Sequence, residues 1–249
     1  MRNPSTDVAK NQSIVPVLEI RGAGFGYGQT VVVDIAAFDL LPGERVAMVG
    51  PSGCGKTTIL STIAGAREPL YGTLQIQGEA RDALWRSQNT ARTIQSFPLF
   101  HWLTVRQNVR LACRIRGVAH ADIDAILAEF SATALADRYP QALSGGERCR
   151  ASLAQAAVAS PRLLLLDEPF TGLDTLVKED VAQTLYEFAQ NRQIPVLLVT
   201  HDLDDAVHFS ERVVVLGENS PTRVLAEVHT SESNALNTVR ETLRRNAHD

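Results

Sequence analysis

The segment from Gly50 to Thr58 carries the residue types that bind the phosphates of a nucleotide. It reads Gly-Pro-Ser-Gly-Cys-Gly-Lys-Thr-Thr, which fits the phosphate-loop pattern G-x-x-x-x-G-K-[ST] between an expected strand and an expected helix. Glycines let successive backbone N–H groups turn toward a polyphosphate, Lys56 can reach the β- and γ-phosphates, and the Thr57 hydroxyl can bind Mg²⁺. A ligand-free turn between strand and helix is the structural alternative, which the Lys-Thr pair disfavours. The expected phosphate-binding residues are Gly50, Pro51, Ser52, Gly53, Cys54, Gly55, Lys56, Thr57 and Thr58.

A second candidate group is the acidic pair Asp167 and Glu168, which follows the apolar run Leu163–Leu166. A buried strand that ends in a carboxylate can hold Mg²⁺ opposite the hydroxyl of a phosphate loop. We therefore expect Asp167 to ligate the metal, directly or through water, and Glu168 to deprotonate the attacking water. Without a phosphate loop in the chain, a solvated acidic turn would explain the same residues equally well.

The sequence Leu-Ser-Gly-Gly-Glu from Leu143 to Glu147 allows two interpretations that are compatible with each other. Ser144 and Glu147 have the spacing of a capping box at the start of an alanine-rich helix. A helix capped in this way, with Gly145 and Gly146 in its first turn, also presents bare N–H groups to an anion. We expect both a helix cap and a second phosphate contact here.

Cys54 lies inside the phosphate loop, two residues before Lys56. It is either an inert small residue or a thiol activated by the neighbouring ammonium and by the following helix N-terminus. The electrostatic argument favours the activated thiol, and we therefore predict that Cys54 is more reactive than Cys113 or Cys149.

Strand and helix patterns around these motifs predict an α/β core with a helical insertion. The last expected strand is Val213–Leu216, and a short helix with Leu236, Val239 and Leu243 on one side should follow at about 231–245. Short apolar runs are typical of strands buried in a parallel sheet. The expected strands are Val17–Arg21, Ile35–Leu40, Arg45–Val49, Thr73–Gln77, Leu163–Leu166, Val196–Thr200 and Val213–Leu216.

Domain boundaries follow from the same pattern. Residues 1–13 are polar and predict a flexible leader, and residues 14–249 are expected to form one domain. Within it, we expect a catalytic α/β lobe at 14–94 and 160–229 and a helical subdomain at about 95–159.

Composition narrows the class of protein. The chain has 249 residues, 45% hydrophobic and 21% charged, which is typical of a globular protein. A net charge of -4 without a basic block argues against nucleic-acid binding. Three scattered cysteines do not make a disulfide framework and fit a reducing compartment. The chain shows no apolar run of roughly 20 residues that would span a bilayer, and no signal peptide, so we expect a cytoplasmic location.

Taken together, the motifs resemble the nucleotide-binding subunits of ABC transporters. The resemblance covers roughly residues 17–217 and depends on five elements in order: the phosphate loop, Gln95, Leu-Ser-Gly-Gly-Glu, Leu-Asp-Glu-Pro-Phe and Thr-His-Asp. It implies an α/β fold: a P-loop NTPase (RecA-like) core with an antiparallel β subdomain and an inserted α-helical subdomain. It also implies ATP and Mg²⁺ as the bound nucleotide and metal.

The resemblance implies further roles. Gln95 would sense Mg²⁺ and the γ-phosphate, His201 would contact the γ-phosphate, and Asp174 would lie at the seam of a head-to-tail homodimer. There, each phosphate loop faces Ser144, Gly145 and Gly146 of the other copy. Tyr27 resembles the aromatic residue that stacks on adenine, although Phe25 is close by. Glu147 stands where the family usually has Gln.

The amino-acid sequences of several motifs resemble those of bacterial importers. The stretch Leu99–Val105 and the segment His201–Ala206 are similar to those of nitrate, sulfonate and taurine importers, with His101 in place of Pro and Asp205 in place of Glu. The resemblance implies two transmembrane permease subunits, an associated solute-binding protein and a position on the cytoplasmic face of the membrane. The apolar stretch from Phe97 to Trp102 is either core of the helical lobe or part of a groove for the permease. An exporter or lipid-trafficking ATPase, or a soluble ABC ATPase, remains the alternative.

Overall fold

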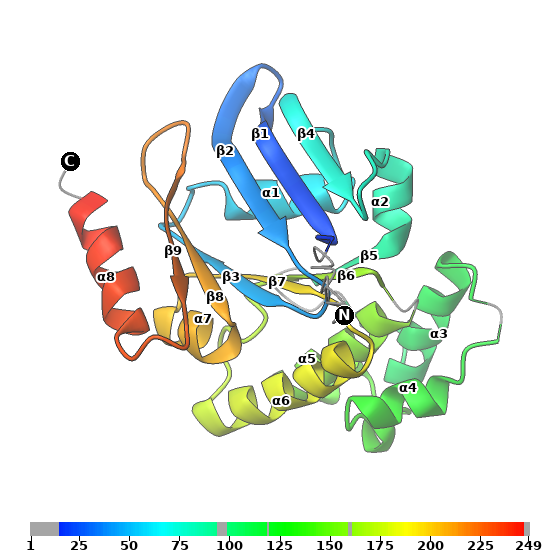
Figure 1. Cartoon of the computed structure of the whole chain (residues 1–249). Helices are drawn as coiled ribbons and strands as arrows, with labels where there is room; N and C mark the ends of the chain where they lie inside the picture. Colours follow the sequence, from blue (N-terminus) through cyan, green and yellow to red (C-terminus); the bar gives the residue numbers. More distant parts are fainter. Residues whose placement is uncertain (1–14, 94–98, 119, 159–160, 247–249) are drawn as a thin grey trace, which may run out of the picture.

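The computed structural model describes residues 15–93, 99–118, 120–158 and 161–246. Its elements form a small antiparallel sheet, a larger and mostly parallel sheet, and a group of helices on the far side of the larger sheet (Figure 1). The expected leader at 1–13 lies outside the described residues. Among those described, no helix has the length and apolar character needed to cross a bilayer.

The large sheet has the strand order β5-β6-β7-β3-β8-β9, with β9 antiparallel to β8 and the other neighbours parallel. Strands β3, β6, β7 and β8 are buried along nearly their whole length because both faces of the sheet are covered. The strands are β3 (Arg45–Val49), β5 (Thr90–Thr93), β6 (Leu163–Asp167), β7 (Val196–Thr200), β8 (Arg212–Leu216) and β9 (Val224–His229).

Alternate residues of these strands enter two different cores. On one face, Met48, Leu165 and Leu197 pack with helix α1 and with the small sheet. On the other face, Ala47 and Leu198 pack with the helices of the far layer. The period-2 alternation of strand side chains therefore produces two cores from one sheet.

The small sheet has the order β2-β1-β4 and lies above the large one (Figure 1). Its strands are β1 (Leu18–Tyr27), β2 (Thr30–Leu40) and β4 (Tyr71–Ile76). The first two are much longer than the sequence pattern predicted. Their pairing shifts register between Phe25 and Gly26, and the glycines of β1 interrupt the alternation on which the prediction of that strand depended.

The helices confirm the expected helical stretch between residues 99 and 158. There, α3, α4 and α5 pack against one another beside the sheet (Figure 1). The helices are α1 (Lys56–Ile63), α2 (Ala83–Asn89), α3 (Val105–Ile115), α4 (Ile123–Glu129), α5 (Gly145–Ala157), α6 (Thr175–Asn191), α7 (Leu203–Phe209) and α8 (Ala235–Asn246), with 3₁₀ turns at Thr133–Leu135 and Pro140–Ala142.

The prediction that Val213–Leu216 is the last strand was wrong. Strand β9 follows it and pairs along Val224–His229 as the edge of the sheet. Its residues alternate between half-buried and exposed, so the segment lacks the continuous apolar run of the buried strands. The C-terminal helix is present as α8, with Val239 fully buried and Leu236 and Leu243 partly buried on the core.

Candidate active site

The phosphate loop connects β3 to α1 at the carboxyl end of the large sheet. Gly53 and Gly55 adopt left-handed backbone conformations, with φ of 84° and 96°. A Cβ atom on Gly55 would lie 2.2 Å from Val33 Cγ2, so that position lacks space as well as the backbone freedom for a side chain. The two glycines are therefore required by the turn that directs the loop into the helix N-terminus.

Lys56 lies beneath this loop and is 8% exposed. Its Nζ donates hydrogen bonds to the carbonyl oxygens of Gly50, at 2.6 Å, and Pro51, at 2.8 Å. The ammonium group is thereby held inside the curve of the loop, next to the N-terminus of α1. Both the cation and the helix dipole favour an anion at this place.

Thr57 and Asp167 approach each other from α1 and from the end of β6. Thr57 Oγ1 lies 3.4 Å from Asp167 Oδ1. Two adjacent oxygen ligands of an octahedral Mg²⁺ lie about 3 Å apart, because Mg–O distances are about 2.1 Å. The two oxygens therefore fit a magnesium site that nucleotide phosphates would complete. Within the described part of the chain, no group of three or more His, Cys, Asp or Glu residues could hold a metal without such phosphates.

Glu168 is the centre of a hydrogen-bonded cluster at the ends of β6 and β7. His201 Nδ1 lies 2.8 Å from its Oε1, and the Thr200 hydroxyl donates to its Oε2 at 3.3 Å. The Thr171 hydroxyl also donates to Oε2, at 3.2 Å. An ionised carboxylate only accepts hydrogen bonds, so the proton of a neutral His201 is on Nδ1 and Nε2 is the acceptor.

The backbone of Glu168 is held in an uncommon conformation, with φ of 51°. Its N–H donates to Val199 O at 2.9 Å, which fixes the residue to the neighbouring strand. Such a conformation costs of order 1–3 kcal/mol and persists where the surrounding structure enforces it. The structure brings the expected site residues Glu168 and His201 together. Sequence reasoning did not identify Thr171 and Thr200 as partners of the carboxylate.

A second group that sequence reasoning missed lies next to His201. Lys178 Nζ, on α6, lies 2.9 Å from Asp205 Oδ1 and 3.3 Å from Asp202 Oδ2, both on the segment that begins α7. Burial raises the pKa of Asp205, and the hydrogen bond from Lys178 opposes that effect. This ion pair connects α6 to the segment that carries His201.

The N-terminus of α5 has the predicted capping box. Ser144 Oγ accepts a hydrogen bond from Glu147 N at 3.3 Å, and Glu147 Oε2 accepts one from Ser144 N at 2.7 Å. A Cβ atom on Gly146 would lie 2.3 Å from Val177 Cγ1, so the close packing of α5 on α6 requires this glycine. Ser144 is exposed, Gly145 and Glu147 are partly exposed, and Gly146 is buried.

Asp174 lies at the start of α6, and Tyr27 lies beside the phosphate loop. The Asp174 carboxylate caps α6 by accepting a hydrogen bond from Val177 N at 3.1 Å. Tyr27 is 54% exposed, and its hydroxyl lies 3.2 Å from Thr58 Oγ1 beside the phosphate loop. Phe25 is fully buried and unavailable to a ligand. The Arg67 guanidinium, which sequence reasoning missed, stacks 4.1 Å from the centre of the Tyr27 ring.

The structure contradicts the electrostatic reason given for an activated thiol at Cys54. The thiol is 5% exposed, and burial raises its pKa even though Lys56 Nζ lies 3.8 Å from its Sγ. Desolvation of a thiolate therefore outweighs the attraction of the neighbouring ammonium. Gln95 lies outside the described residues, as does Phe97.

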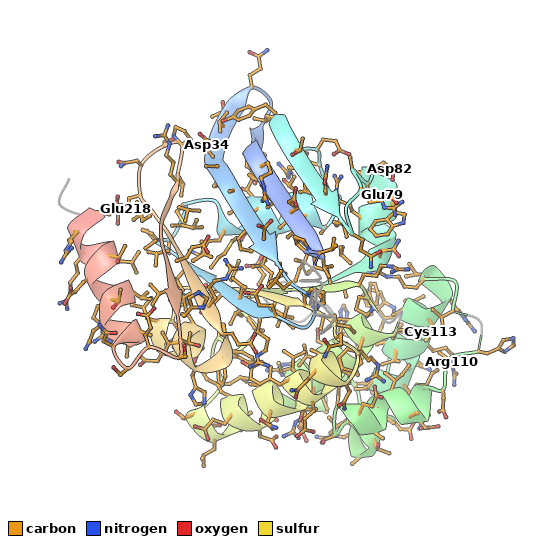
Figure 2. All side chains as sticks on the ribbon, viewed as in Figure 1. Asp34, Glu79, Asp82, Arg110, Cys113 and Glu218 are labelled. Atoms are coloured by element: carbon orange, nitrogen blue, oxygen red, sulfur yellow. The ribbon has the colours of Figure 1, made fainter. Side chains whose placement is uncertain are left out.

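Two cavities border these groups. One of about 370 Å³ lies beside the phosphate loop and is lined by residues 51–54 together with Glu218 and Thr222 of the β8–β9 connection. Figure 2 shows Glu218 near the start of that connection, on the side of the molecule where α8 lies. A larger cavity of about 550 Å³ is lined by Lys178, Asp202 and Asp205 and lies away from the loop residues.

An exposed aromatic group precedes α3. Phe100 and Trp102 are 37% and 60% exposed, with ring centres 5.1 Å apart. A shallow cavity of about 200 Å³ lies beside Phe100 and is lined also by Ala112 and Ile115. This surface is the only part of the predicted permease groove that the described residues include.

A phosphate loop, an Asp-Glu strand end and a second glycine-bearing helix N-terminus on an inserted helical lobe are together typical of a nucleotide-binding cassette. The family model described as ABC transporter matches residues 33–171. The chain therefore belongs to the ABC transporter family.

The curated relatives of the chain are consistent with this family assignment. The aliphatic sulfonates import ATP-binding protein SsuB 1 of Pseudomonas aeruginosa is 38% identical over 220 residues, which cover 87% of this chain and 86% of that protein. The sulfate/thiosulfate import protein CysA of Thermosynechococcus vestitus is 35% identical over 83% of this chain. The spermidine/putrescine import protein PotA of Pseudomonas aeruginosa is 36% identical over 82%. The chain spans only 63% of that CysA and 57% of that PotA.

Solved structures confirm the fold. An ATP-binding subunit of an ABC transporter is 26% identical with a TM-score of 0.74, covering 90% of this chain and 94% of that one. The cassette MJ0796, solved as a dimer after hydrolysis with ADP and phosphate bound, is 24% identical with a TM-score of 0.73, covering 86% and 99%. The predicted fold class, a P-loop NTPase core with a β subdomain and a helical insertion, is confirmed.

Proposed function

We propose that this chain is the ATP-binding and ATP-hydrolysing subunit of an importer for a small anion of the nitrate, sulfonate or taurine kind. The observation that carries the proposal is the Glu168 cluster. A carboxylate directly follows a magnesium-competent Asp167, and His201, Thr200 and Thr171 hold it in place. This arrangement is suited to activating water beside a bound triphosphate.

Binding of ATP begins at the phosphate loop. Backbone N–H groups from Gly50 to Gly55 surround the phosphates, Lys56 neutralises the β- and γ-phosphates, and Tyr27 stacks on adenine. Thr57, Asp167 and Gln95 hold Mg²⁺, which neutralises negative charge on the phosphates when it is bound.

Hydrolysis then requires a base near the γ-phosphate. Glu168 takes the proton of the attacking water, and its hydrogen bonds keep the carboxylate oriented for in-line attack. With Nδ1 donating to Glu168, the imidazolium form of His201 would also have a proton on Nε2, which can donate a hydrogen bond to an oxygen of the γ-phosphate. His201 is 61% exposed, so this face is accessible until another surface covers it.

The covering surface is a second copy of the chain. In the proposed homodimer, Ser144, Gly145 and Gly146 of one copy face the phosphates bound by the other, and Asp174 lies at the seam. ATP closes the pair and hydrolysis reopens it. The exposed Ser144 at the start of α5 and the solved dimer of a cassette with the same fold support this arrangement.

Two permease subunits would follow this motion through the exposed Phe100 and Trp102. The complex would lie on the cytoplasmic face of the membrane and receive solute from a solute-binding protein. The import functions named for the sulfonate and nitrate relatives support this assignment, and the sulfonate protein supports the choice of anion. Stimulation of ATP hydrolysis by a polyamine instead of a sulfonate or nitrate, in a reconstituted transporter, would contradict that choice.

Subunit mixing tests the shared site. The variants Lys56→Ala and Ser144→Arg should each lack ATPase activity alone. Mixed, they form heterodimers with one undamaged composite site, so partial recovery of activity is expected. Arg162→Ala, a change on an exposed side chain remote from the site residues, is the matched control. Full activity of Ser144→Arg alone would contradict a site built from two copies.

A further inference from the structure

The first turn of α5 carries a full negative charge where the proposed dimer brings a triphosphate. Both Glu147 carboxylate oxygens are engaged: Oε2 accepts from Ser144 N at 2.7 Å and Oε1 from Arg138 Nη1 at 3.0 Å. The hydrogen bond from Ser144, together with the nearby Arg138, lowers the pKa of Glu147, so the carboxylate is ionised at neutral pH.

This charge opposes the reason a helix N-terminus binds phosphate. The N-terminal end of a helix is equivalent to about +0.5 elementary charge. An ionised carboxylate in the same turn exceeds that charge in magnitude. Unless another cation offsets Glu147, the end of α5 would repel the phosphates that Ser144, Gly145 and Gly146 are proposed to contact.

Arg138 is placed to supply that cation. It lies in the loop between the two 3₁₀ turns, and its guanidinium donates both to Glu147 and to the Ala142 carbonyl oxygen. Its own carbonyl oxygen accepts a hydrogen bond from Val105 N, at 3.0 Å, which fixes the loop to the start of α3. The guanidinium is therefore held from two sides and cannot easily leave the carboxylate.

We propose that Arg138 is a positioning residue that neutralises Glu147, so that the N-terminus of α5 can accept the triphosphate bound by a second copy. This inference rests on the proposed function, because it needs the composite site.

Solvent exposure determines how much the Arg138–Glu147 pair contributes to stability and to closure of the dimer. In the single chain, Arg138 and Glu147 are 45% and 29% exposed, and such pairs contribute little to stability. Closure of the dimer would cover them and remove water, which strengthens every charge interaction there. The effect of Arg138 should therefore appear in nucleotide-driven closure and hardly at all in the stability of the free chain.

One other cation lies near this turn. Arg148 donates to the Leu143 carbonyl oxygen at 2.8 Å, so it remains when Arg138 is changed. Loss of Arg138 should consequently weaken the site without abolishing it.

A double-mutant cycle on the full-length homodimer tests the inference. Arg138→Gln keeps an amide that can donate to Ala142 but removes the charge, and Glu147→Gln keeps the cap but removes the carboxylate. Arg138→Gln should raise KM for ATP by about tenfold, with kcat changed less, in the otherwise wild-type chain. In the Glu147→Gln background, the same change should have an effect of under about twofold.

Two further measurements separate charge from structure. Higher salt should shrink the Arg138→Gln defect, because screening weakens the repulsion. Arg110→Ala on α3, which Figure 2 places on the far side of that helical group beside Cys113, removes the same charge and should leave KM unchanged. Thermal unfolding of Arg138→Gln should match wild type.

The outcomes are distinct. An equal loss in both backgrounds would show that Arg138 acts through packing and would overturn the inference, while recovery in the subunit-mixing experiment would leave the proposed function intact. If mixing recovers no activity and Ser144→Arg is fully active alone, the composite site fails and this inference fails with it.

Discussion

The two helix N-termini proposed to face phosphate, those of α1 and α5, are held by the chain in opposite ways. The start of α1 has no side-chain cap; its loop is closed by glycines, by Val33 and by the buried Lys56. The start of α5 is held by a reciprocal side-chain cap and by Arg138, and it remains open to solvent.

This difference follows from position. At α1, tertiary packing from two sheets surrounds the loop, so the site is built within one chain and is close to its final form. At α5, the helix lies at the edge of the helical lobe, where only local interactions hold the first turn. Such a surface is suited to meeting another chain, and its charge must be balanced by its own neighbours.

The largest expected effect concerns the catalytic residue Glu168, which lies on the phosphate-loop side of the site. Glu168→Gln should slow ATP hydrolysis by roughly 10²–10⁴, because the amide cannot accept the proton of the attacking water. ATP binding should survive, and the variant should run as an ATP-bound dimer in size-exclusion chromatography. Glu232→Gln on the exposed loop before α8 is the matched control. Turnover close to wild type would remove Glu168 from the mechanism.

A smaller effect tests how tightly the first turn of α5 packs against α6. Gly146→Ala places a methyl group against Val177 and should lower the free energy of unfolding by about 1–3 kcal/mol. For a chain of this size, each kcal/mol corresponds to a shift in melting temperature of roughly 2–4 °C. Thermal unfolding measures it.

A second substitution should restore the stability lost in the Gly146→Ala variant. Val177→Ala in the Gly146→Ala background should recover most of the loss, because it removes the atom that the new methyl group meets. Gly145→Ala, whose Cβ would lie 3.0 Å from Leu173 Cδ2, should cost less than Gly146→Ala. Equal losses at both glycines would contradict the packing explanation.

The smallest effect concerns how well the phosphate loop shields Cys54 from solvent. Maleimide should modify Cys54 slowly at neutral pH, because the thiol is buried and its pKa is raised. Cys113 and Cys149 should also react slowly, since burial raises the pKa of Cys149 to about 12 and raises that of Cys113 as well. Labelling of Cys54 should become faster with increasing pH.

Peptide mapping by mass spectrometry measures this labelling, and the same protein in denaturant is the control in which all three cysteines react. Rapid modification of Cys54 in the folded chain at neutral pH would show that the loop opens more than the structure indicates.

Several parts of the fold could be predicted because they depend on local pattern. The strands from Arg45, Leu163 and Val196 are continuous apolar runs, and both ends of the capping box lie within one turn of helix. Strand β9 was missed because an edge strand needs no apolar run, and β1 was predicted too short because its glycines and the bulge at Gly26 break the alternation.

The sequence by itself determined the phosphate loop, the Asp167–Glu168 pair and the cap at Ser144, since each lies in a few consecutive residues whose geometry is local. The family resemblance added His201 and Tyr27. Only the tertiary structure decided that Tyr27 is exposed and Phe25 buried, that Cys54 is desolvated, and that Thr200 and His201 reach Glu168. Burial and parallel strand register join segments far apart in the chain, and the pairing of Asp167 with Val199 places the ends of β6 and β7 side by side.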